Sequence, residues 1–230
     1  MSGFVPIYFQ VPFADKAAAK AMGARWNHDL KVWFAPSPDV ASAMRLRWRE
    51  IAEVEPITVL PGEDRLFGSG LFVDLIPRSC WFTNVRSCIA PEDWTRLSVG
   101  IRQRAGNRCE ICSADGIMEA HERWDYRPDG TQVLKRLVSV CSPCHQVTHF
   151  GLSQLRGLEE ECAAHWAQVN PGIDFDAHVE QAFALWAVRN RRAWALDLSI
   201  IEQAGLTIVR PVAAADRRAI ADHKLTGHGG

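Results

Sequence analysis

The sequence lacks an apolar run long enough to cross a bilayer, and its start does not resemble a secretory signal. No apolar stretch approaches the roughly 18–20 residues that a membrane-spanning helix needs. Met1 to Phe4 lacks a charged region followed by an apolar run. We therefore expect a cytoplasmic protein with no membrane partner.

The sequence also lacks an excess of charge of one sign. It has 26 basic residues (Lys and Arg) and 27 acidic ones (Asp and Glu). This balance argues against a strongly basic nucleic-acid-binding protein of the histone kind, although it leaves room for a local basic face. No internal repeat or low-complexity tract is present. The hydrophobic content of 47% and the nine tryptophans are enough to form real cores, in one large domain or in two or three small ones.

The seven cysteines are an odd number, which does not suit a disulfide framework. Four of them form two Cys-x-x-Cys pairs, and 28 residues separate the pairs. Each pair can form a tight knuckle that offers both sulfur atoms to one tetrahedral zinc ion. The alternative is four incidental buried cysteines. The sequence predicts a structural zinc ion held by Cys109, Cys112, Cys141 and Cys144.

The first 55 residues alternate short strand and helix patterns. Residues 4–11 predict a strand, Asp15 to Met22 a helix that Gly23 ends, residues 31–34 a return strand, and residues 39–54 a second helix. This part resembles the small DUF5710 module, which is appended to DNA-processing proteins of plasmids and phages. The resemblance rests on Val11-Pro12-Phe13, Lys16, Ala19-Lys20, Gly23-Ala24-Arg25-Trp26, Lys31, Trp33 and Pro36. Two roles stay open: a folding unit with core aromatics, or a nucleic-acid-touching appendage that uses Lys16, Lys20, Arg25 and Lys31.

The segment between the knuckles has the pattern of a β-hairpin. Residues 117–124 and 131–140 are strand-like, and residues 127–130 give a strong turn signal. The second knuckle runs into a short helix that carries His145 and His149, which lie four residues apart and so share one helical face. His121 on the hairpin completes a set of three histidines. We expect a second divalent metal ion (Mg²⁺, Mn²⁺, Ni²⁺ or Zn²⁺) between the hairpin and the helix, in a ββα-metal arrangement.

With these features the chain resembles the HNH endonuclease superfamily, directly over residues 109–151. His121 matches the first histidine of the family's hairpin motif, His145 and His149 match the helix positions that hold the catalytic metal, and the four cysteines match the zinc clamp of many members. The resemblance implies metal-dependent hydrolysis of phosphodiester bonds in nucleic acid, with DNA as the expected substrate. It also implies an α+β fold with a small N-terminal module, a zinc-clamped ββα-metal core and surrounding C-terminal helices. The expected domains are residues 1–55, 56–155 and 156–230.

Two positions depart from the family pattern, and both leave alternatives open. Glu122 stands where the family usually has its general base, and Arg136 stands in place of a central asparagine. A carboxylate can act as a general base. However, adjacent residues of a regular strand point to opposite faces, so Glu122 reaches the metal only if the strand is bulged. A second assignment makes Glu119 a metal ligand and His121 the base. A non-catalytic zinc-containing nucleic-acid-binding or adaptor module is the alternative to the enzyme.

Several basic residues are candidates for contacts with phosphates. A helix that begins at Pro91 carries or precedes three arginines, and a fourth arginine follows Glu122. Helices are predicted at residues 158–169, 174–192 and from 213 onward, with short extended segments at 194–198 and 206–209. The lone histidines His165 and His178 are expected to be packing or surface groups. The oligomeric state is left open. The candidate nucleic-acid-binding residues are Arg102, Arg104, Arg108 and Arg123.

Overall fold

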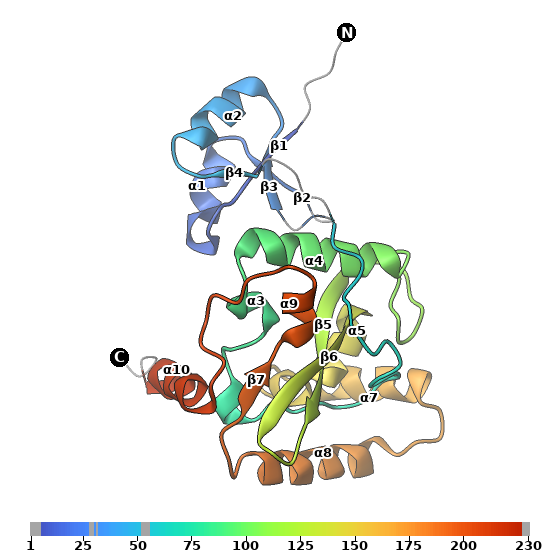
Figure 1. Cartoon of the computed structure of the whole chain (residues 1–230). Helices are drawn as coiled ribbons and strands as arrows, with labels where there is room; N and C mark the ends of the chain where they lie inside the picture. Colours follow the sequence, from blue (N-terminus) through green and yellow to red (C-terminus); the bar gives the residue numbers. More distant parts are fainter. Residues whose placement is uncertain (1–5, 28–29, 31, 52–55, 227–230) are drawn as a thin grey trace.

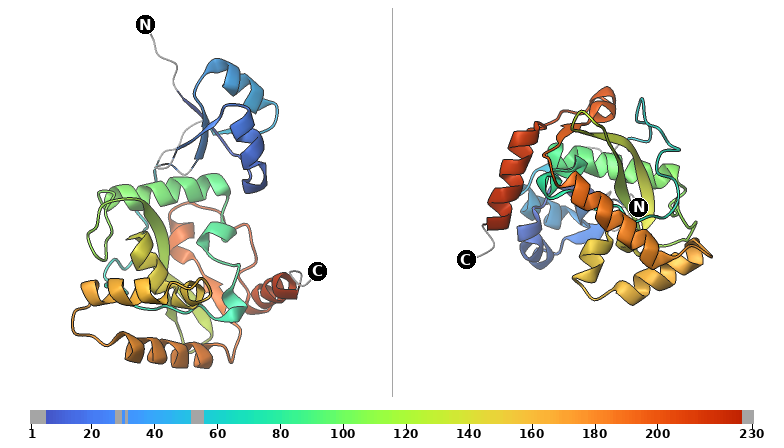
Figure 2. Two further views of the ribbon diagram at one scale, coloured as in Figure 1. Left: turned by 180° about the vertical axis from the view of Figure 1, so that it is seen from behind. Right: turned by 90° about the horizontal axis from the view of Figure 1, so that it is seen from below.

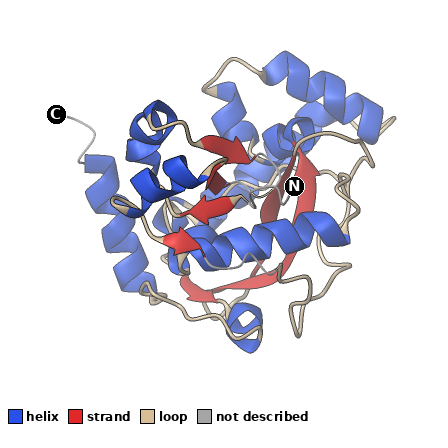
Figure 3. Cartoon of the chain, turned by 90° about the horizontal axis from the view of Figure 1, so that it is seen from above, coloured by secondary structure: helices blue, strands red, loops and turns tan. Residues whose placement is uncertain are grey.

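The computed structural model describes residues 6–27, 30, 32–51 and 56–226. The chain forms a small N-terminal module and a larger body built around a long β-hairpin (Figure 1). Helices lie around the central strands of the larger body (Figure 3). These features confirm the expected α+β fold class. None of the helices in the described ranges is long and apolar enough to cross a membrane.

The N-terminal module is a four-stranded antiparallel sheet with two helices. The strand order is β2-β3-β1-β4, and Phe9 and Met44 are fully buried in its core. Helix α1 ends just before Gly23, whose φ of +86° lets the chain turn into β2 as the sequence predicts. The elements are β1 (Ile7–Phe9), η1 (Phe13–Asp15), α1 (Lys16–Ala21), β2 (Arg25–Asn27), β3 (Val32–Ala35), α2 (Pro38–Arg45) and β4 (Glu50–Ile51).

The helix expected over residues 39–54 is wrong in its second half. Helix α2 stops at Arg45, and the chain then returns to the sheet, where Ile51 of β4 pairs with Tyr8 of β1. Trp48 is buried, but it is buried from a turn and not from a helix. The apolar residues at helical spacing nevertheless share one core, because Met44 of α2 and Trp48 of the following turn pack in the same cluster. Their spacing indicated burial and not a continuous helix. Residues 4–5 and 52–55 of the expected strand and helix lie outside the described residues.

The hairpin of the larger body follows the sequence prediction closely. Strand β5 (Met118–Tyr126) pairs with β6 (Thr131–Cys141), and β7 (Ala195–Asp197) adds to β6 in parallel. The turn between β5 and β6 is closed by a hydrogen bond of 2.9 Å from the Arg127 N–H to the Thr131 carbonyl, with Gly130 at a φ of +92°. The register shifts after the pair Arg123–Arg136, so Lys135 is the extra residue of a β-bulge.

Each face of the hairpin is covered by its own apolar cluster. Leu137 packs with α3, α4 and α9, whereas its neighbour Val138 packs with α5 and α7, because successive strand residues point to opposite faces. Figure 2 shows α7 and α8 together on the side of the hairpin away from α4. The remaining elements are η2 (Arg78–Cys80), α3 (Val85–Cys88), α4 (Pro91–Arg104), α5 (Ser142–Thr148), α6 (Phe150–Gln154), α7 (Glu159–Val169), α8 (Phe175–Arg189), α9 (Ser199–Gln203) and α10 (Ala214–Thr226).

Three apolar segments of the larger body form no strand. Residues 71–76 are extended but unpaired in any ladder, and Leu71 and Val73 bury their side chains against the α5 face of the hairpin. Cys80 lies in a short 3₁₀ helix, and residues 206–209 run alongside α3, where the Val209 N–H donates to the Cys88 carbonyl at 2.7 Å. In these segments the apolar pattern indicates that the chain is buried, but it does not indicate that the chain pairs with a strand of a sheet.

Candidate functional site

The four cysteines of the two knuckles converge at one end of the hairpin. The sulfur atoms of Cys109, Cys112, Cys141 and Cys144 all lie within 4.8 Å of one another, and those of Cys112 and Cys141 are 3.6 Å apart. We call this group the cysteine quartet. A tetrahedral zinc ion with Zn–S bonds of about 2.3 Å places its sulfurs about 3.8 Å apart, so the quartet has the size of such a site. The quartet can hold a metal ion.

Local backbone contacts explain how the quartet forms. The first knuckle turns at Ser113, which has a φ of +61° and donates its N–H to the Cys109 carbonyl at 2.9 Å. The Glu110 N–H donates to the Ser139 carbonyl at 2.8 Å and ties that knuckle to β6. Cys141 is the N-cap of α5, with Pro143 in the helix's first turn. The second knuckle is therefore the start of the helix that carries His145.

The chemistry of the four thiols fits a bound cation. A hydrogen bond from the Cys144 thiol lowers the pKa of Cys109 to about 4, whereas burial raises the pKa of Cys141 to about 11. The hydrogen bond to Cys109, burial and the neighbouring thiolate charges raise the pKa of Cys144. Four sulfurs this close become thiolates together only when a positive ion balances them. The seven cysteines include no disulfide.

His165 is part of the quartet's surroundings, which the sequence did not reveal. Its Nε2 atom lies 3.1 Å from the Cys144 sulfur, and it comes from α7, 21 residues further along the chain. An N–H donated to a metal-bound thiolate orients that ligand and reduces its charge. His165 belongs to neither metal-holding group of the described residues, but beyond the packing or surface role expected for it, its ring contacts a sulfur of the quartet. Its partner Cys144 lies on a different helix, so no spacing in the sequence pointed to the contact.

Three histidines converge on the neighbouring face of α5, as the sequence predicts. Candidate ligand nitrogens of His121, His145 and His149 lie within 4.8 Å of one another. The ring centroids are 4.7–5.1 Å apart and the rings meet edge to face. We call this group the histidine cluster. His121 comes from β5, His145 from α5, and His149 from the residue that caps the end of α5.

The protonation and hydrogen bonding of the histidine cluster suit a metal ion. Burial and the nearby cations lower the pKa of His121 well below its ordinary value, and the pKa of His149 to about 3, so both rings are neutral at pH 7. The Nε2 atom of His121 is buried with no hydrogen-bond partner. A buried nitrogen with a free lone pair is costly unless a ligand takes it. The donor set and this orphaned atom fit a divalent cation.

Two glutamates lie beside the histidine cluster in different positions. A Glu119 carboxylate oxygen is 3.5 Å from Nδ1 of His145, where it can fix the orientation of that ring. Glu122 pairs with Leu137 across the hairpin, on the opposite face from His121, and the bulge comes one residue too late to turn it. Glu122 is 9% exposed, and burial raises the pKa of its carboxyl.

One groove nevertheless brings Glu122 and the histidines to a common space. This groove has a volume of about 1090 Å³ and lies between the N-terminal module and the larger body. Its lining includes the histidine cluster, Glu119 and Glu122, together with Asn84 and Arg86 from the α3 region and Arg102 from α4. The groove is open to solvent and large enough for a polymer segment. The cysteine quartet does not line it.

The four arginines predicted to bind nucleic acid do not share one surface. Arg102 lines the groove, although it is only 6% exposed and its Nε donates to the Ser98 carbonyl. Arg104 forms two hydrogen bonds of 2.6 and 2.7 Å with the Glu63 carboxylate, in a buried pair. Arg108 is exposed and pairs with Asp115 outside the groove.

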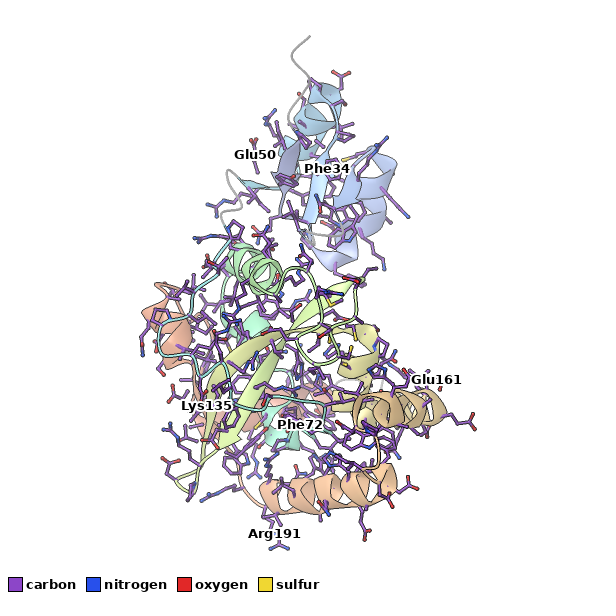
Figure 4. All side chains as sticks on the ribbon, turned by 90° about the vertical axis from the view of Figure 1, so that its right-hand side faces the viewer. Phe34, Glu50, Phe72, Lys135, Glu161 and Arg191 are labelled. Carbon is purple, nitrogen blue, oxygen red and sulfur yellow. The ribbon has the colours of Figure 1, made fainter. Side chains whose placement is uncertain are left out.

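The fourth arginine, Arg123, has an entirely internal position. It is fully buried, its guanidinium lies 4.2 Å from the ring centroid of Phe72, and burial lowers its pKa to about 10 (Phe72 is labelled in Figure 4). The expectation of phosphate contacts is corrected for Arg104 and Arg123, because internal partners and burial keep both guanidinium groups away from solvent. Arg86, which was not among the arginines predicted from the sequence, is an exposed arginine of the groove, and its charge acts on the Glu122 carboxyl.

The basic residues of the N-terminal module also divide between the groove and other surfaces. Lys16 lines the groove, together with Arg47 and Arg49. Lys20 and Arg25 are exposed elsewhere on the module. Lys31 lies outside the described residues.

The fold and these groups define an α+β protein with two sets of residues able to hold metal ions. Comparison with known families finds one match: the family described as "Domain of unknown function (DUF5710)" matches residues 7–49. This range is the N-terminal module, and the match confirms the resemblance of that part of the chain. No curated protein matches the sequence. No solved structure matches it either.

Proposed function

We propose that this protein is a metal-dependent endonuclease of the HNH type, which hydrolyses phosphodiester bonds in nucleic acid, with DNA as the expected substrate. The observation that carries the proposal is the histidine cluster itself: three imidazoles from a hairpin and a following helix, close enough to share one ion, in the lining of an open groove. A non-catalytic module would need a structural ion only, and the cysteine quartet already provides for one.

Each metal group has its own task in this proposal. The cysteine quartet holds a zinc ion that staples the knuckles to the start of α5. A divalent cation at the histidine cluster would supply Lewis acidity toward the phosphate and its leaving oxygen. His121 and His149 present neutral rings, and the Glu119 carboxylate keeps the His145 ring in place through Nδ1. Arg86, exposed on the side of the groove, holds a neighbouring phosphate by charge and hydrogen bonds.

Glu122 is the proposed general base, which accepts a proton from the attacking water on a carboxylate oxygen. It lies on the other face of β5 from His121 and is therefore no metal ligand, but both residues line the same groove. Burial raises the pKa of the Glu122 carboxyl, which makes its carboxylate a better proton acceptor than an ordinary surface glutamate. The alternative base is His121, but that ring already belongs to the histidine cluster, whereas Glu119 pairs with His145. Both Glu122 and His121 line the groove, so an experiment decides between the two assignments.

The substitution Glu122→Gln separates these two assignments. We expect it to slow hydrolysis by about 100-fold, the lower end of what general-base catalysis supplies. The wild-type rate should rise as the pH passes upward through the raised pKa of Glu122, because only the carboxylate accepts a proton, and this limb should be missing in the variant. Initial rates between pH 4 and 9 measure both effects, with Glu180→Gln on exposed α8 as the control. A variant with the wild-type rate and profile would assign the base to another group.

Incubation of the protein with supercoiled plasmid and with labelled single-stranded DNA and RNA tests the proposed function. We expect cleavage with at least one of Mg²⁺, Mn²⁺, Ni²⁺ and Zn²⁺, and none after chelation of the exchangeable ion. Metal analysis should find one tightly held ion and a second exchangeable one. If every substrate stays intact with all four cations and only one ion is found, the protein is a binding or adaptor module.

A further inference from the structure

The groove above the histidine cluster has one wall that the catalytic proposal does not use. This wall belongs to the N-terminal module, whose role the family description leaves unknown. The module contributes two exposed aromatic residues and three cationic residues to the groove. They are Phe13, Trp26, Lys16, Arg47 and Arg49.

The exposed aromatic rings of this wall are not needed by the module's core. Phe13 is 81% exposed and Trp26 is 37% exposed, whereas Phe9 and Trp48 of the same module are buried in its core. Trp26 meets Trp33 edge to face at a centroid distance of 5.5 Å, so its ring has a packing partner although the residue is partly exposed. Single exposed apolar residues are common on protein surfaces, but two flat rings along one groove form a platform.

Cationic groups lie next to these rings and on the facing wall. The Nζ atom of Lys16 is 4.1 Å from the centroid of the Phe13 ring. Arg47 is exposed on the module, and Arg86 is exposed on the larger body. The lining contains five Lys or Arg residues and three carboxylates (Glu92, Glu119 and Glu122), so the groove is positive in a protein whose net charge is −1. A positive groove with aromatic platforms is complementary to a nucleic-acid strand.

We propose that the N-terminal module is the substrate-strand clamp of this protein, and that it binds an unpaired strand by stacking bases on Phe13 and Trp26. A protein ring can stack only on a base whose face is free. In a duplex each base face is covered by its neighbours, and unstacking one step costs a few kcal/mol. In a single strand every base offers a face, whatever its identity. The substrate class is therefore single-stranded DNA or RNA, or the unpaired part of a branched molecule. This inference rests on the proposed function for what happens to the strand once it is bound.

Binding by the full-length His149→Ala protein tests the clamp without cleavage. Fluorescence anisotropy would compare one labelled sequence as single-stranded DNA, as single-stranded RNA and as a DNA duplex, at one fixed salt concentration. We expect the single strands to bind at least about tenfold more tightly than the duplex. Phe13→Ala and Trp26→Ala should each weaken single-strand binding by about tenfold, as loss of one stacking ring does. Lys16→Gln should lower the salt dependence by about one released ion.

Matched control variants test whether the loss of binding is specific to the residues of the groove. Leu46→Ala removes an exposed apolar side chain of the same module (87% exposed) outside the groove, and Arg156→Gln removes an exposed charge from the larger body. Both should bind like the parent protein, and Phe13→Trp should restore what Phe13→Ala loses. Thermal melts would establish that each variant is folded. The two single strands, compared directly, show whether the 2′-hydroxyl is used.

Three outcomes overturn the clamp: equal affinity for duplex and single strands, unchanged affinity of folded Phe13→Ala and Trp26→Ala, or an equal loss in the Leu46→Ala control. These outcomes are separate from a failure of the proposed function. If the protein cleaves nucleic acid but Phe13→Ala binds normally, only the clamp is wrong. If no cation supports cleavage but single strands bind through Phe13, the clamp stands and the hydrolytic function is wrong.

Discussion

His149→Ala is expected to abolish cleavage of nucleic acid, with a loss of at least about 100-fold in rate, while the protein stays folded. Removal of one imidazole leaves two ligands for the catalytic ion, and loss of even an outer-shell partner commonly costs 10–100-fold in metal affinity or activity. His149 caps the end of α5 and is not part of either large apolar cluster. Removing its ring therefore costs little packing. Plasmid cleavage with a series of cation concentrations measures the loss.

His223→Ala on α10 is the matched control, since His223 is exposed and lies outside the groove. It should cleave like the wild-type protein. Metal analysis gives an independent readout: the His149→Ala protein should keep the tightly held ion of the cysteine quartet and lose the exchangeable one. Full cleavage by the His149→Ala protein would remove His149 from the mechanism.

The parts of the site that could be predicted from sequence are those with strong local signals. Two Cys-x-x-Cys pairs, a turn at residues 127–130 and two histidines four apart each constrain their own neighbourhood. Once the turn pairs β5 with β6, Met118 lies opposite Cys141 and both knuckles meet at one end of the hairpin. The histidine cluster then follows, because His121 lies three residues along β5 from that end and α5 begins at the second knuckle.

The parts that could not be predicted depend on contacts between distant segments. The buried state of Arg104 and Arg123 comes from Glu63 and Phe72, which lie about 40 to 50 residues earlier in the chain. His165 reaches Cys144 only because α7 packs against α5. The position of the N-terminal module next to the histidine cluster likewise depends on contacts between segments that are far apart in the chain. A basic residue has no signature in sequence that separates a phosphate contact from an internal ion pair, since both need only a nearby anion.

The position of the histidine cluster depends on the cysteine quartet, whereas the quartet does not depend on the histidines. Both groups use α5. Cys141 and Cys144 fix the start of this helix, and His145 and His149 follow within one or two turns. Loss of the quartet should therefore displace the histidines, whereas loss of a histidine should leave the quartet in place. The stability of this end of the hairpin also depends on the quartet, because Cys109, Cys141 and Cys144 belong to the apolar cluster that includes Val140, Val147 and Trp166.

Cys144→Ser is expected to cost about 5 kcal/mol or more of unfolding free energy, together with the tightly bound ion and all cleavage. Structural zinc contributes about 10–16 kcal/mol in isolated zinc-finger peptides, and a whole domain is stable by only about 5–15 kcal/mol. Serine is a hard, weak ligand, and its hydroxyl would face buried sulfurs and the ring of His165. Chemical denaturation monitored by tryptophan fluorescence measures the change.

Cys162→Ser is the control, because Cys162 is equally buried in the same cluster but is no member of the quartet. It should keep its metal and lose far less stability. Equal stability and equal metal content in the two variants would mean that the quartet is a packed group of thiols and not a metal clamp.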